Sequence, residues 1–391
     1  MPANGDPSSP LRVLMVTPHL PPKWAANAIL PVQLGSALDS FRTECRFLAH
    51  ASRDQRSGVA HTYYAPRRGR GRWWRTKIGA LIAAVRIAMC ALPLIKSSDV
   101  IHLHGNGLIV EIADWLASRL RKPRVLTLYG TDVWHHDETR HRRFGSVVRN
   151  ASSRVFYSEA LREFADNLGL APDPSAVIYA PVASTFRSFG MERRSKFRKE
   201  LGLDQSVVLL TVKRLHPVAG HEDLLRAMPV ICSNHKNVRL LIIGEGESRA
   251  ALEALTKELN LTESIQFLGG ISNEDLYRYY VSADLFVLPS RLESWGTVML
   301  EALACGTPVV TTQTAGGQEI AQLFPADVRV AAVDSPADLA RAVRTGLETH
   351  RRVSRDVQAR FSIEACARNY HSIYCQVIAD SGQSRETRFD T

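Results

Sequence analysis

The chain has 391 residues, which favours two domains over one, and its hydrophobic (45%) and charged (23%) shares exclude disordered, collagen-like and coiled-coil proteins. The formal net charge is +10, yet eight basic residues and no acidic one lie between Arg67 and Lys96, so the basicity is local. A local patch, without a zinc-finger, homeodomain or RNP1-like string, indicates that nucleic acid is not a partner.

The first half of the chain alternates short apolar runs with longer helical stretches, a pattern typical of α/β proteins. The runs are almost continuously apolar, as parallel strands buried on both faces require. We predict strands at 11–17, 45–50, 99–104, 124–129 and 153–158, and helices near 28–40, 77–95, 107–120 and 159–168. These elements predict a Rossmann-like N-terminal domain over residues 1–185.

Within this half, the apolar run 78–95 is interrupted by Arg86 and Pro93, so we do not expect it to span a membrane. The run follows RRGRGRWWRTK, a basic segment with Trp73 and Trp74. Segments of this type lie on anionic lipid surfaces, so the sequence predicts peripheral contact with an anionic membrane. A solvated loop that leads into a core helix is the alternative.

A charged stretch at 187–200 separates the first domain from a second series of alternating elements. We predict strands at 207–212, 238–244, 264–269, 284–290 and 307–312, and helices at 248–260, 273–282 and 296–304. Residues 201–365 thus form a second Rossmann-like domain, and residues 366–391 form a helix and tail expected to pack on the first. Two such domains facing a central cleft bind ligands at the carboxyl ends of their strands.

The six cysteines lie scattered, without a C-x-x-C pair or a histidine at zinc-ligand spacing. We therefore expect reduced thiols in a cytoplasmic protein, with no disulfide framework and no metal site. The N-terminal string MPANGDPSSP has no basic region followed by an apolar stretch, so it does not indicate secretion.

The most informative string runs over residues 289–319, PSRLESWGTVMLEALACGTPVVTTQTAGGQE. A strand ends in a loop with Glu293, and a helix starts near Gly296, where free amide groups can bind phosphate. Glu301 lies about two turns into that helix, so two carboxylates flank the phosphate position. Carboxylates accept strong hydrogen bonds from sugar hydroxyls. A pair of glutamates also fits a helix N-terminal acid and a solvated side chain.

The complete string resembles the retaining, family-4-type glycosyltransferases of GT-B fold. Glu293 and Glu301 have the seven intervening residues of that family's E-x7-E motif, followed by EALACGTPVV and a GG-x-E end. Other strings in family order are LTLYGTDVW, SEALREF, TVKRL, IIGEGESRAAL, FLGGISNEDLYRYY and SADLFVLPS.

The resemblance implies that Glu301 binds the nucleotide ribose and that Glu293 contacts the donor sugar. It implies that Arg214 neutralises the β-phosphate, a role that suits the guanidinium fork; a surface ion pair is the alternative. The family's following lysine is Ala219 here, so the second cation is missing unless Lys213, at a usual glycine position, supplies it. Backbone amides toward the diphosphate and sugar are expected from Trp295, Gly296 and Thr297.

Glycine turns belong to the same resemblance. Gly244 and Gly246 are expected beside the bound nucleotide, and Gly269 and Gly270 at the wall of the nucleobase site. Such turns also serve only to reverse the chain.

The first domain is expected to bind the acceptor. His104 ends one strand, and Tyr129 ends the next, where the family usually has a histidine that reaches the donor sugar. A tyrosine offers its hydroxyl or its ring but no protonated imidazole. Asp132 is an acceptor candidate and equally a helix cap.

The loop after the first strand adds three acceptor candidates by position, Lys23, Trp24 and Asn27. The family usually has a glycine pair in this loop, whereas this chain has Ala25 and Ala26. Alanine lacks the positive-φ freedom of glycine, so the acceptor mouth is expected to differ from that of the family.

The resemblance implies a retaining glycosyltransferase that moves a hexosyl unit from a nucleoside-diphosphate sugar to an acceptor hydroxyl. No cofactor and no metal are expected, and no D-x-D string occurs. The acceptor is expected to be lipid-linked, in cell-envelope or exopolysaccharide biosynthesis. The alternative is a small acceptor such as an aminocyclitol in antibiotic biosynthesis. A phosphorylase, an epimerase and a non-catalytic sugar-nucleotide binding module are the competing classes.

Overall fold

The computed structural model of the chain describes residues 9–21, 26–50, 59–66, 76–134, 142–235, 237–349 and 357–386. The chain divides into two compact units. Unit 1 comprises Met1–Tyr179 with Ile363–Thr391, and unit 2 comprises Ala180–Ser362. The boundary between the units therefore precedes the expected position at residue 185, and the C-terminal helix begins at Ile363 and not at residue 366.

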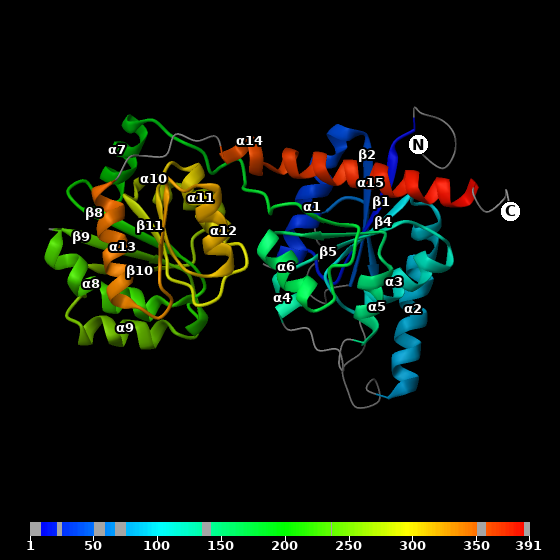
Figure 1. Ribbon diagram of the computed structural model, residues 1–391, viewed down its shortest axis with the longest axis horizontal. Coiled ribbons are helices and arrows are strands. Elements are labelled where there is room, and N and C mark those ends of the chain that lie inside the picture. The colour runs from blue at the N-terminus through cyan, green and yellow to red at the C-terminus, as the bar shows by residue number, and fades with distance from the viewer. Residues whose placement is uncertain are drawn as a thin grey trace. The chain divides into compact units, whose positions relative to one another are not determined.

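Unit 1 is built on a parallel sheet with the strand order β3-β2-β1-β4-β5-β6-β7 among its described residues (Figure 1). Its central strands consist of buried, mostly apolar residues, as parallel strands covered on both faces require. The strands are β1 (Leu11–Thr17), β2 (Thr43–His50), β3 (Thr62–Ala65), β4 (Val100–His104), β5 (Arg124–Leu128), β6 (Ser153–Phe156) and β7 (Ser175–Val177).

The helices of unit 1 follow the strands in a doubly wound arrangement. They are α1 (Ala26–Leu38), the 3-10 helix η1 (Asp39–Phe41), α2 (Lys77–Lys96), α3 (Leu108–Arg119), α4 (Gly130–Trp134), α5 (Arg142–Asn150) and α6 (Glu159–Asn167), with the C-terminal α15 (Ile363–Glu386). One apolar core lies under α2, α3 and α5 and a second under α1 and α15, so both faces of the sheet are covered.

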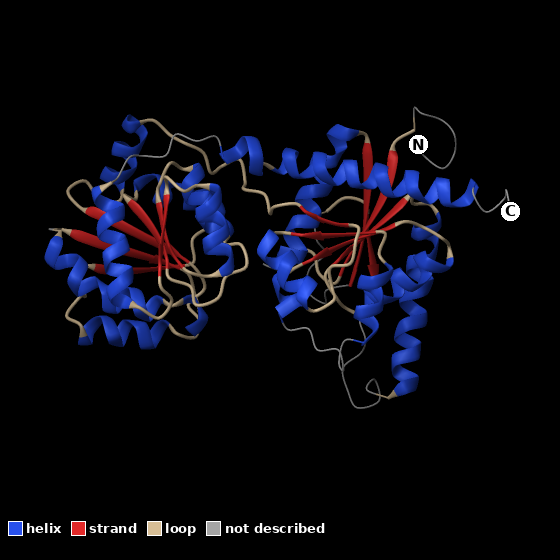
Figure 2. Cartoon of the chain, viewed as in Figure 1, coloured by secondary structure: helices blue, strands red, loops and turns tan. Residues whose placement is uncertain are grey.

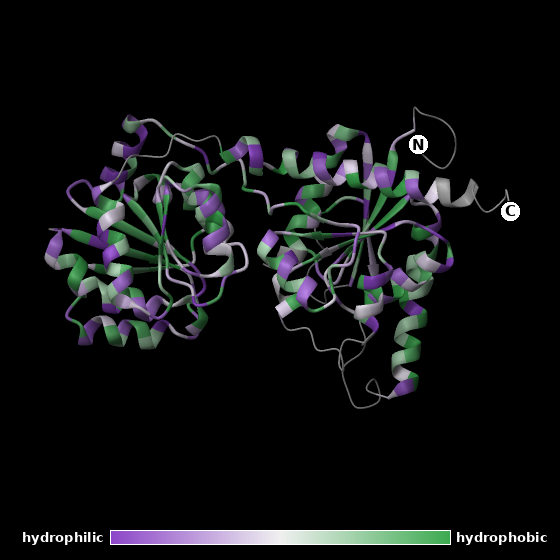
Figure 3. Ribbon diagram, in the orientation of Figure 1, coloured by the Kyte–Doolittle hydropathy of each residue, from purple (hydrophilic) through white to green (hydrophobic). Residues whose placement is uncertain are grey.

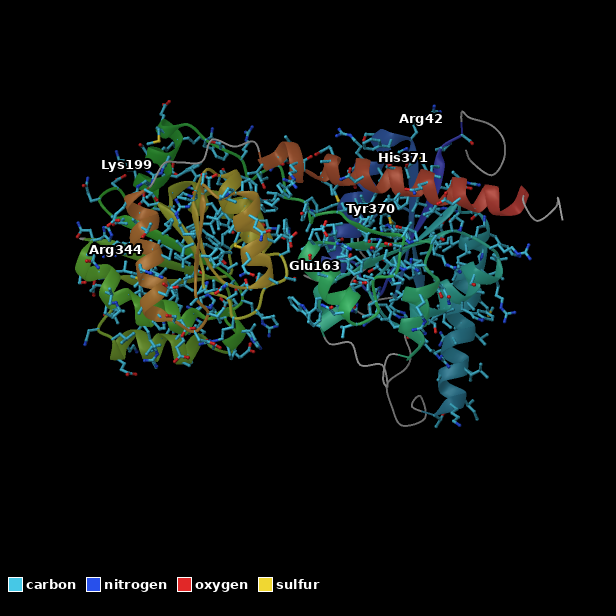
Figure 4. The ribbon with its side chains drawn as sticks, viewed as in Figure 1. Arg42, Glu163, Lys199, Arg344, Tyr370 and His371 are labelled. Atoms are coloured by element: carbon cyan, nitrogen blue, oxygen red, sulfur yellow. The ribbon has the colours of Figure 1, made fainter. Side chains whose placement is uncertain are left out.

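The last helix is an integral part of unit 1, although its sequence follows unit 2. α15 lies along α1, and Figure 4 labels Tyr370 and His371 on it. Tyr370 and Tyr374 are fully buried against the sheet, and His371 lies within hydrogen-bond distance of Thr43 at 3.1 Å. The C-terminal helix therefore closes one core of unit 1.

Unit 2 repeats the same design, with the parallel order β10-β9-β8-β11-β12-β13 among its described strands (Figure 2). The strands are β8 (Val207–Val212), β9 (Val238–Ile243), β10 (Ile265–Gly269), β11 (Leu285–Leu288), β12 (Val309–Thr312) and β13 (Val328–Ala331). The helices are α7 (Met191–Glu200), the 3-10 helix η3 (Pro217–Ala219), α8 (His221–Asn234), α9 (Arg249–Glu258), α10 (Asn273–Ser282), α11 (Thr297–Ala304), α12 (Ala315–Leu323), α13 (Pro336–Glu348) and α14 (Val357–Phe361). The prediction of two Rossmann-like domains is confirmed.

The charged stretch expected as a separator contains α7 and belongs to unit 2. Phe197 on this helix is buried, and Arg194 and Arg198 both pair with Asp284 at the start of β11. The second domain was expected to start at residue 201, whereas unit 2 starts at Ala180 and includes this helix, because long basic side chains can cover a helix face while their charged ends pair with a carboxylate.

Helix α2 has two apolar faces. One face is buried and consists of residues at four-residue spacing, Gly79, Ala83, Ile87 and Ala91. The opposite face is exposed to solvent and includes Leu81, which is 64% exposed. By length and composition alone α2 is long enough to cross a membrane, yet it packs on α3 within unit 1. Figure 3 shows how apolar this helix is along its length.

Candidate functional site

The candidate donor residues of unit 2 lie in the loops after strands β8, β9 and β11, at the carboxyl edge of the sheet. Lys213 directly follows β8, and its ammonium group forms an ion pair with Glu293 in the loop after β11. Glu293 is buried and Lys213 is partly exposed. Two residues that are eighty positions apart in sequence therefore meet at one edge of the sheet.

Glycines allow the loops at this edge to touch. A Cβ atom at Gly244 would lie 2.0 Å from the Lys213 carbonyl oxygen, and one at Gly246 would lie 2.1 Å from the Leu215 carbonyl oxygen. Gly244 also has φ +145°. Both glycines are therefore required for the loop after β9 to lie against the loop after β8, which is a structural role in addition to the expected place beside a nucleotide.

The loop with Glu293 ends where α11 begins. Gly296 adopts the left-handed conformation with φ +71° and precedes Thr297, the first residue of α11. The amide of Gly316 at the start of α12 donates to the Glu293 carbonyl oxygen at 2.9 Å, and a Cβ atom at Gly316 would lie 2.6 Å from the amide nitrogen of Trp295. The GG-x-E end of the motif thus fixes this loop, and the indole of Trp295 is buried.

Glu301 lies in α11 against α10. The hydroxyl of the fully buried Tyr280 donates a hydrogen bond of 2.9 Å to its Oε2 atom. Burial raises the pKa of Glu301 from 4.5 to about 7, although the bond from Tyr280 acts in the opposite direction. Tyr280 ends the family string FLGGISNEDLYRYY, but nothing in the sequence indicates that its hydroxyl contacts Glu301, which lies 21 residues further along the chain.

Arg214 has the geometry of the surface ion pair that was the alternative reading. Its side chain is 73% exposed and pairs with Glu247 at 3.2 Å, and His216 lies 3.3 Å from the other oxygen of that carboxylate. An exposed arginine on a flexible stem retains the reach to bind a phosphate.

The glycines expected at a nucleobase wall are arranged around Glu245. The amide of Gly270 donates to Glu245 Oε1 at 3.2 Å, and Gly269 ends β10 with φ +73°. The loops after β9 and β10 are therefore joined by a side-chain-to-backbone bond.

In unit 1 the acceptor candidates are less exposed than a substrate-binding surface requires. His104, Tyr129 and Asp132 are all buried, and the Tyr129 hydroxyl lies 3.1 Å from His104 Nδ1. Burial lowers the pKa of His104 to about 3, so this imidazole is neutral. The Asp132 carboxylate accepts a bond of 3.0 Å from the Tyr129 amide, as a helix-capping side chain does.

Behind these residues lies a buried polar network that links the sheet to α15. Tyr374 contacts His102 Nδ1 at 2.7 Å, and His102 Nε2 contacts Thr127 at 2.8 Å. Thr127 in turn contacts the hydroxyl of Tyr370 at 2.9 Å. Buried polar groups need such partners, and the network therefore fixes α15 on the sheet.

Lys23, Trp24 and Ala25 lie outside the described residues, as do Arg67–Arg75 with both tryptophans. Asn27 lies in the first turn of α1, and its side chain is outside the described part.

Two further observations concern metals and thiols. Among the described residues no group of three or more His, Cys, Asp and Glu side chains is arranged to hold a metal ion. All six cysteines are free thiols.

Part of the chain is similar in sequence to known glycosyltransferases. Residues 193–361 match the family "Glycosyl transferases group 1". An uncharacterized glycosyltransferase of Methanocaldococcus jannaschii is 32% identical over 57% of this chain and 59% of its own length. A GDP-mannose-dependent monoacylated alpha-(1-6)-phosphatidylinositol monomannoside mannosyltransferase of Corynebacterium glutamicum is 30% identical over 41% of this chain and 43% of its own. The chain thus spans about half the length of these relatives.

Solved structures show the same fold over nearly the whole chain. Sucrose-phosphate synthase of Thermosynechococcus elongatus has a TM-score of 0.73 at 20% identity and covers 95% of this chain and 100% of its own. The HepE protein of Anabaena in complex with UDP-glucose has a TM-score of 0.68 at 20% identity, with 96% and 100% covered. The chain therefore has the two Rossmann-like domains of these proteins, and its residues 193–361, which contain the whole candidate donor site, match the group 1 glycosyltransferases.

Proposed function

We propose that this protein is a retaining glycosyltransferase that moves a hexosyl unit from a nucleoside-diphosphate sugar to an acceptor hydroxyl. The observation that carries the proposal is the group of Glu293, Glu301, Lys213 and the start of α11 at one edge of the unit 2 sheet. The match over residues 193–361 supports it. The nucleotide sugars named for the relative and for HepE, GDP-mannose and UDP-glucose, support the donor class.

The proposed chemistry follows from the charges at this edge. When the bond between sugar and phosphate breaks, negative charge grows on the β-phosphate and the sugar becomes cation-like. Arg214 and Lys213 supply positive charge, and the backbone amides at the start of α11 add their dipoles. We propose that these protein groups stabilise the leaving nucleotide without a bound metal.

The carboxylates have separate tasks in this proposal. Glu301 accepts hydrogen bonds from the ribose hydroxyls, and Glu293 accepts them from the donor sugar. Since Lys213 pairs with Glu293, donor binding replaces that ion pair by contacts of the ammonium group with phosphate and of the carboxylate with sugar.

We propose a lipid-linked acceptor in cell-envelope or exopolysaccharide biosynthesis, reached at the cytoplasmic face of a membrane. An apolar surface in unit 1 supports this choice. A cavity of about 580 Å³ opens between α2, α3 and α5, and Leu81, Val85 and Trp115 are among its lining residues. Met89 nearby on α2 is 72% exposed, and the basic string RRGRGRWWRTK leads directly into this helix. Apolar and basic groups together suit an anionic lipid surface.

The test is nucleotide release by the purified protein with a panel of nucleotide sugars. We expect release of nucleoside diphosphate that depends on an added lipid extract. NMR of the product should show that the anomeric configuration of the donor sugar is retained. Release without any acceptor points to an epimerase or a hydrolase, and release with aminocyclitols alone points to the small-acceptor alternative. Binding of nucleotide sugar without release under any condition contradicts the proposal.

A further inference from the structure

A buried histidine that is affected by the charge of Lys213 is not marked by the sequence motifs. His221 is the first residue of α8 and is only 2% exposed. Among the described residues neither of its ring nitrogens has a hydrogen-bond partner. A buried polar group without a partner costs free energy, so such a residue points to a ligand that supplies the missing bonds.

The backbone holds His221 against the loop that contains Glu293. Gly220 precedes it with φ +67°, and a Cβ atom at Gly220 would lie 1.8 Å from the Pro289 carbonyl oxygen. The amide of Arg291 donates to the Val218 carbonyl oxygen at 2.8 Å, which joins the same two segments. The start of α8 and the end of β11 are therefore in direct contact.

The electrostatic surroundings of His221 define its chemistry. Burial first, and the charge of Lys213 second, lower the pKa of His221 to about 4. The imidazole is thus neutral near pH 7 and offers one N–H donor and one acceptor. A sugar hydroxyl, which both donates and accepts, matches this pair of groups, whereas a phosphate oxygen accepts only.

We propose that His221 is a specificity residue that hydrogen-bonds a hydroxyl of the transferred sugar. The inference rests on the proposed function and adds a residue to the donor site. In the free protein the charge of Lys213 acts on the imidazole while its ammonium group is paired with Glu293, and donor binding opens this pair and admits the sugar.

The experiment compares two nucleotide sugars with their own nucleotides. Titration calorimetry measures the affinity of four proteins for UDP-glucose, UDP, GDP-mannose and GDP. The proteins are the wild type, His221→Leu, His221→Gln and the control His235→Leu. His235 lies at the other end of α8 and its Nε2 atom is also buried without a partner among the described residues. We expect His221→Leu to lower the affinity for the nucleotide sugar by roughly tenfold and the affinity for its nucleotide by less than about twofold. His221→Gln retains part of the affinity, and His235→Leu changes neither.

The thermal stability of His221→Leu separates a role in binding from a role in folding. Leucine in place of a buried, unpartnered imidazole should raise the Tm, so His221→Leu is expected to be more stable and yet weaker in sugar binding. The proposal is overturned if His221→Leu loses equal affinity for the nucleotide and the nucleotide sugar, or loses affinity for neither. If the His221 variants do not fold, ¹⁵N-histidine NMR of the wild type decides: a His221 signal that the sugar does not shift beyond the nucleotide alone also overturns it. Failure of the wild type to bind any of the four compounds contradicts the proposed function itself.

Discussion

The two glutamates of the candidate donor site lie in different surroundings, so their substitution should have different effects. Glu293 pairs with Lys213 and faces the proposed sugar position, whereas Glu301 is held by Tyr280 within α11. A ribose contact is equally strong in the ground and transition states, whereas a sugar contact strengthens as charge develops.

We therefore expect Glu301→Ala to weaken donor binding chiefly and Glu293→Ala to lower kcat more than affinity. Steady-state kinetics with direct binding of the donor separate the two effects. If both variants raise only the KM for the donor and leave kcat unchanged, the assignment of roles is wrong.

Glu301 also predicts a pH dependence of stability. Its pKa is raised from 4.5 to about 7 in the folded protein, so folding favours the protonated form. Its contribution to the free energy of unfolding is greatest below the unfolded pKa and falls as the pH rises through about 7, by about 3 kcal/mol at most. Glu301→Gln lacks this titration, so from about pH 5 to about pH 8 the wild type should lose stability relative to the variant. Urea unfolding at both pH values measures the difference, and parallel profiles contradict the prediction.

Arg214 tests the proposal of metal-free charge stabilisation. Its exposed guanidinium pairs with the likewise exposed surface carboxylate of Glu247, so its removal should leave folding intact. Arg214→Ala should lower kcat/KM by a factor that corresponds to about 2–4 kcal/mol of transition-state stabilisation. This is the scale for loss of one preorganised charge-stabilising group. A chelator should leave turnover unchanged. Activity that disappears with chelator and survives the arginine substitution would falsify this account.

At the scale of elements, α15 carries the clearest prediction. Tyr374 on this helix contacts the fully buried His102 at 2.7 Å, and Val377 and Tyr370 on the same face are buried as well. Tyr374→Phe leaves the His102 nitrogen without that partner and should lower the free energy of unfolding by about 1–3 kcal/mol.

The control is Gln376→Ala, an exposed position on the same helix that should stay within about 0.5 kcal/mol of the wild type. Denaturant unfolding followed by tryptophan fluorescence gives both values. Equal stability of Tyr374→Phe and the wild type means that the network does not hold the helix.

At the scale of the whole molecule, the proposed membrane contact depends on the open face of α2. Leu81→Glu and Met89→Glu place charge on this face, and Val230→Glu places it on an exposed apolar residue of unit 2 as a control. We expect the wild type and the control to sediment with anionic vesicles and the α2 variants to lose most of this binding. Salt should weaken it, because the Debye length falls from about 10 Å at 0.1 M to about 3 Å at 1 M. Equal pelleting with neutral and anionic vesicles, or none, contradicts the membrane contact.

The sequence by itself determined the class of fold and most of its elements. Strand β1 at Leu11–Thr17 and helix α10 at Asn273–Ser282 have their predicted bounds, because a buried parallel strand is a continuous apolar run and a helix has its own period. Strands β3, β7 and β13 were not predicted, since these short strands with exposed or partly exposed residues lack such a run. The motif around Glu293 and Glu301 was visible because its residues follow one another along the chain.

Only the tertiary structure decided which side chains meet. Lys213 reaches Glu293 from the end of a different strand, Tyr280 reaches Glu301 from a different helix, and His221 is buried at the start of α8. Likewise, α15 completes unit 1 although the whole of unit 2 separates them in sequence. A local pattern records propensity and turn geometry, whereas burial, pairing and a missing hydrogen-bond partner are properties of segments that come together only when the sheets form.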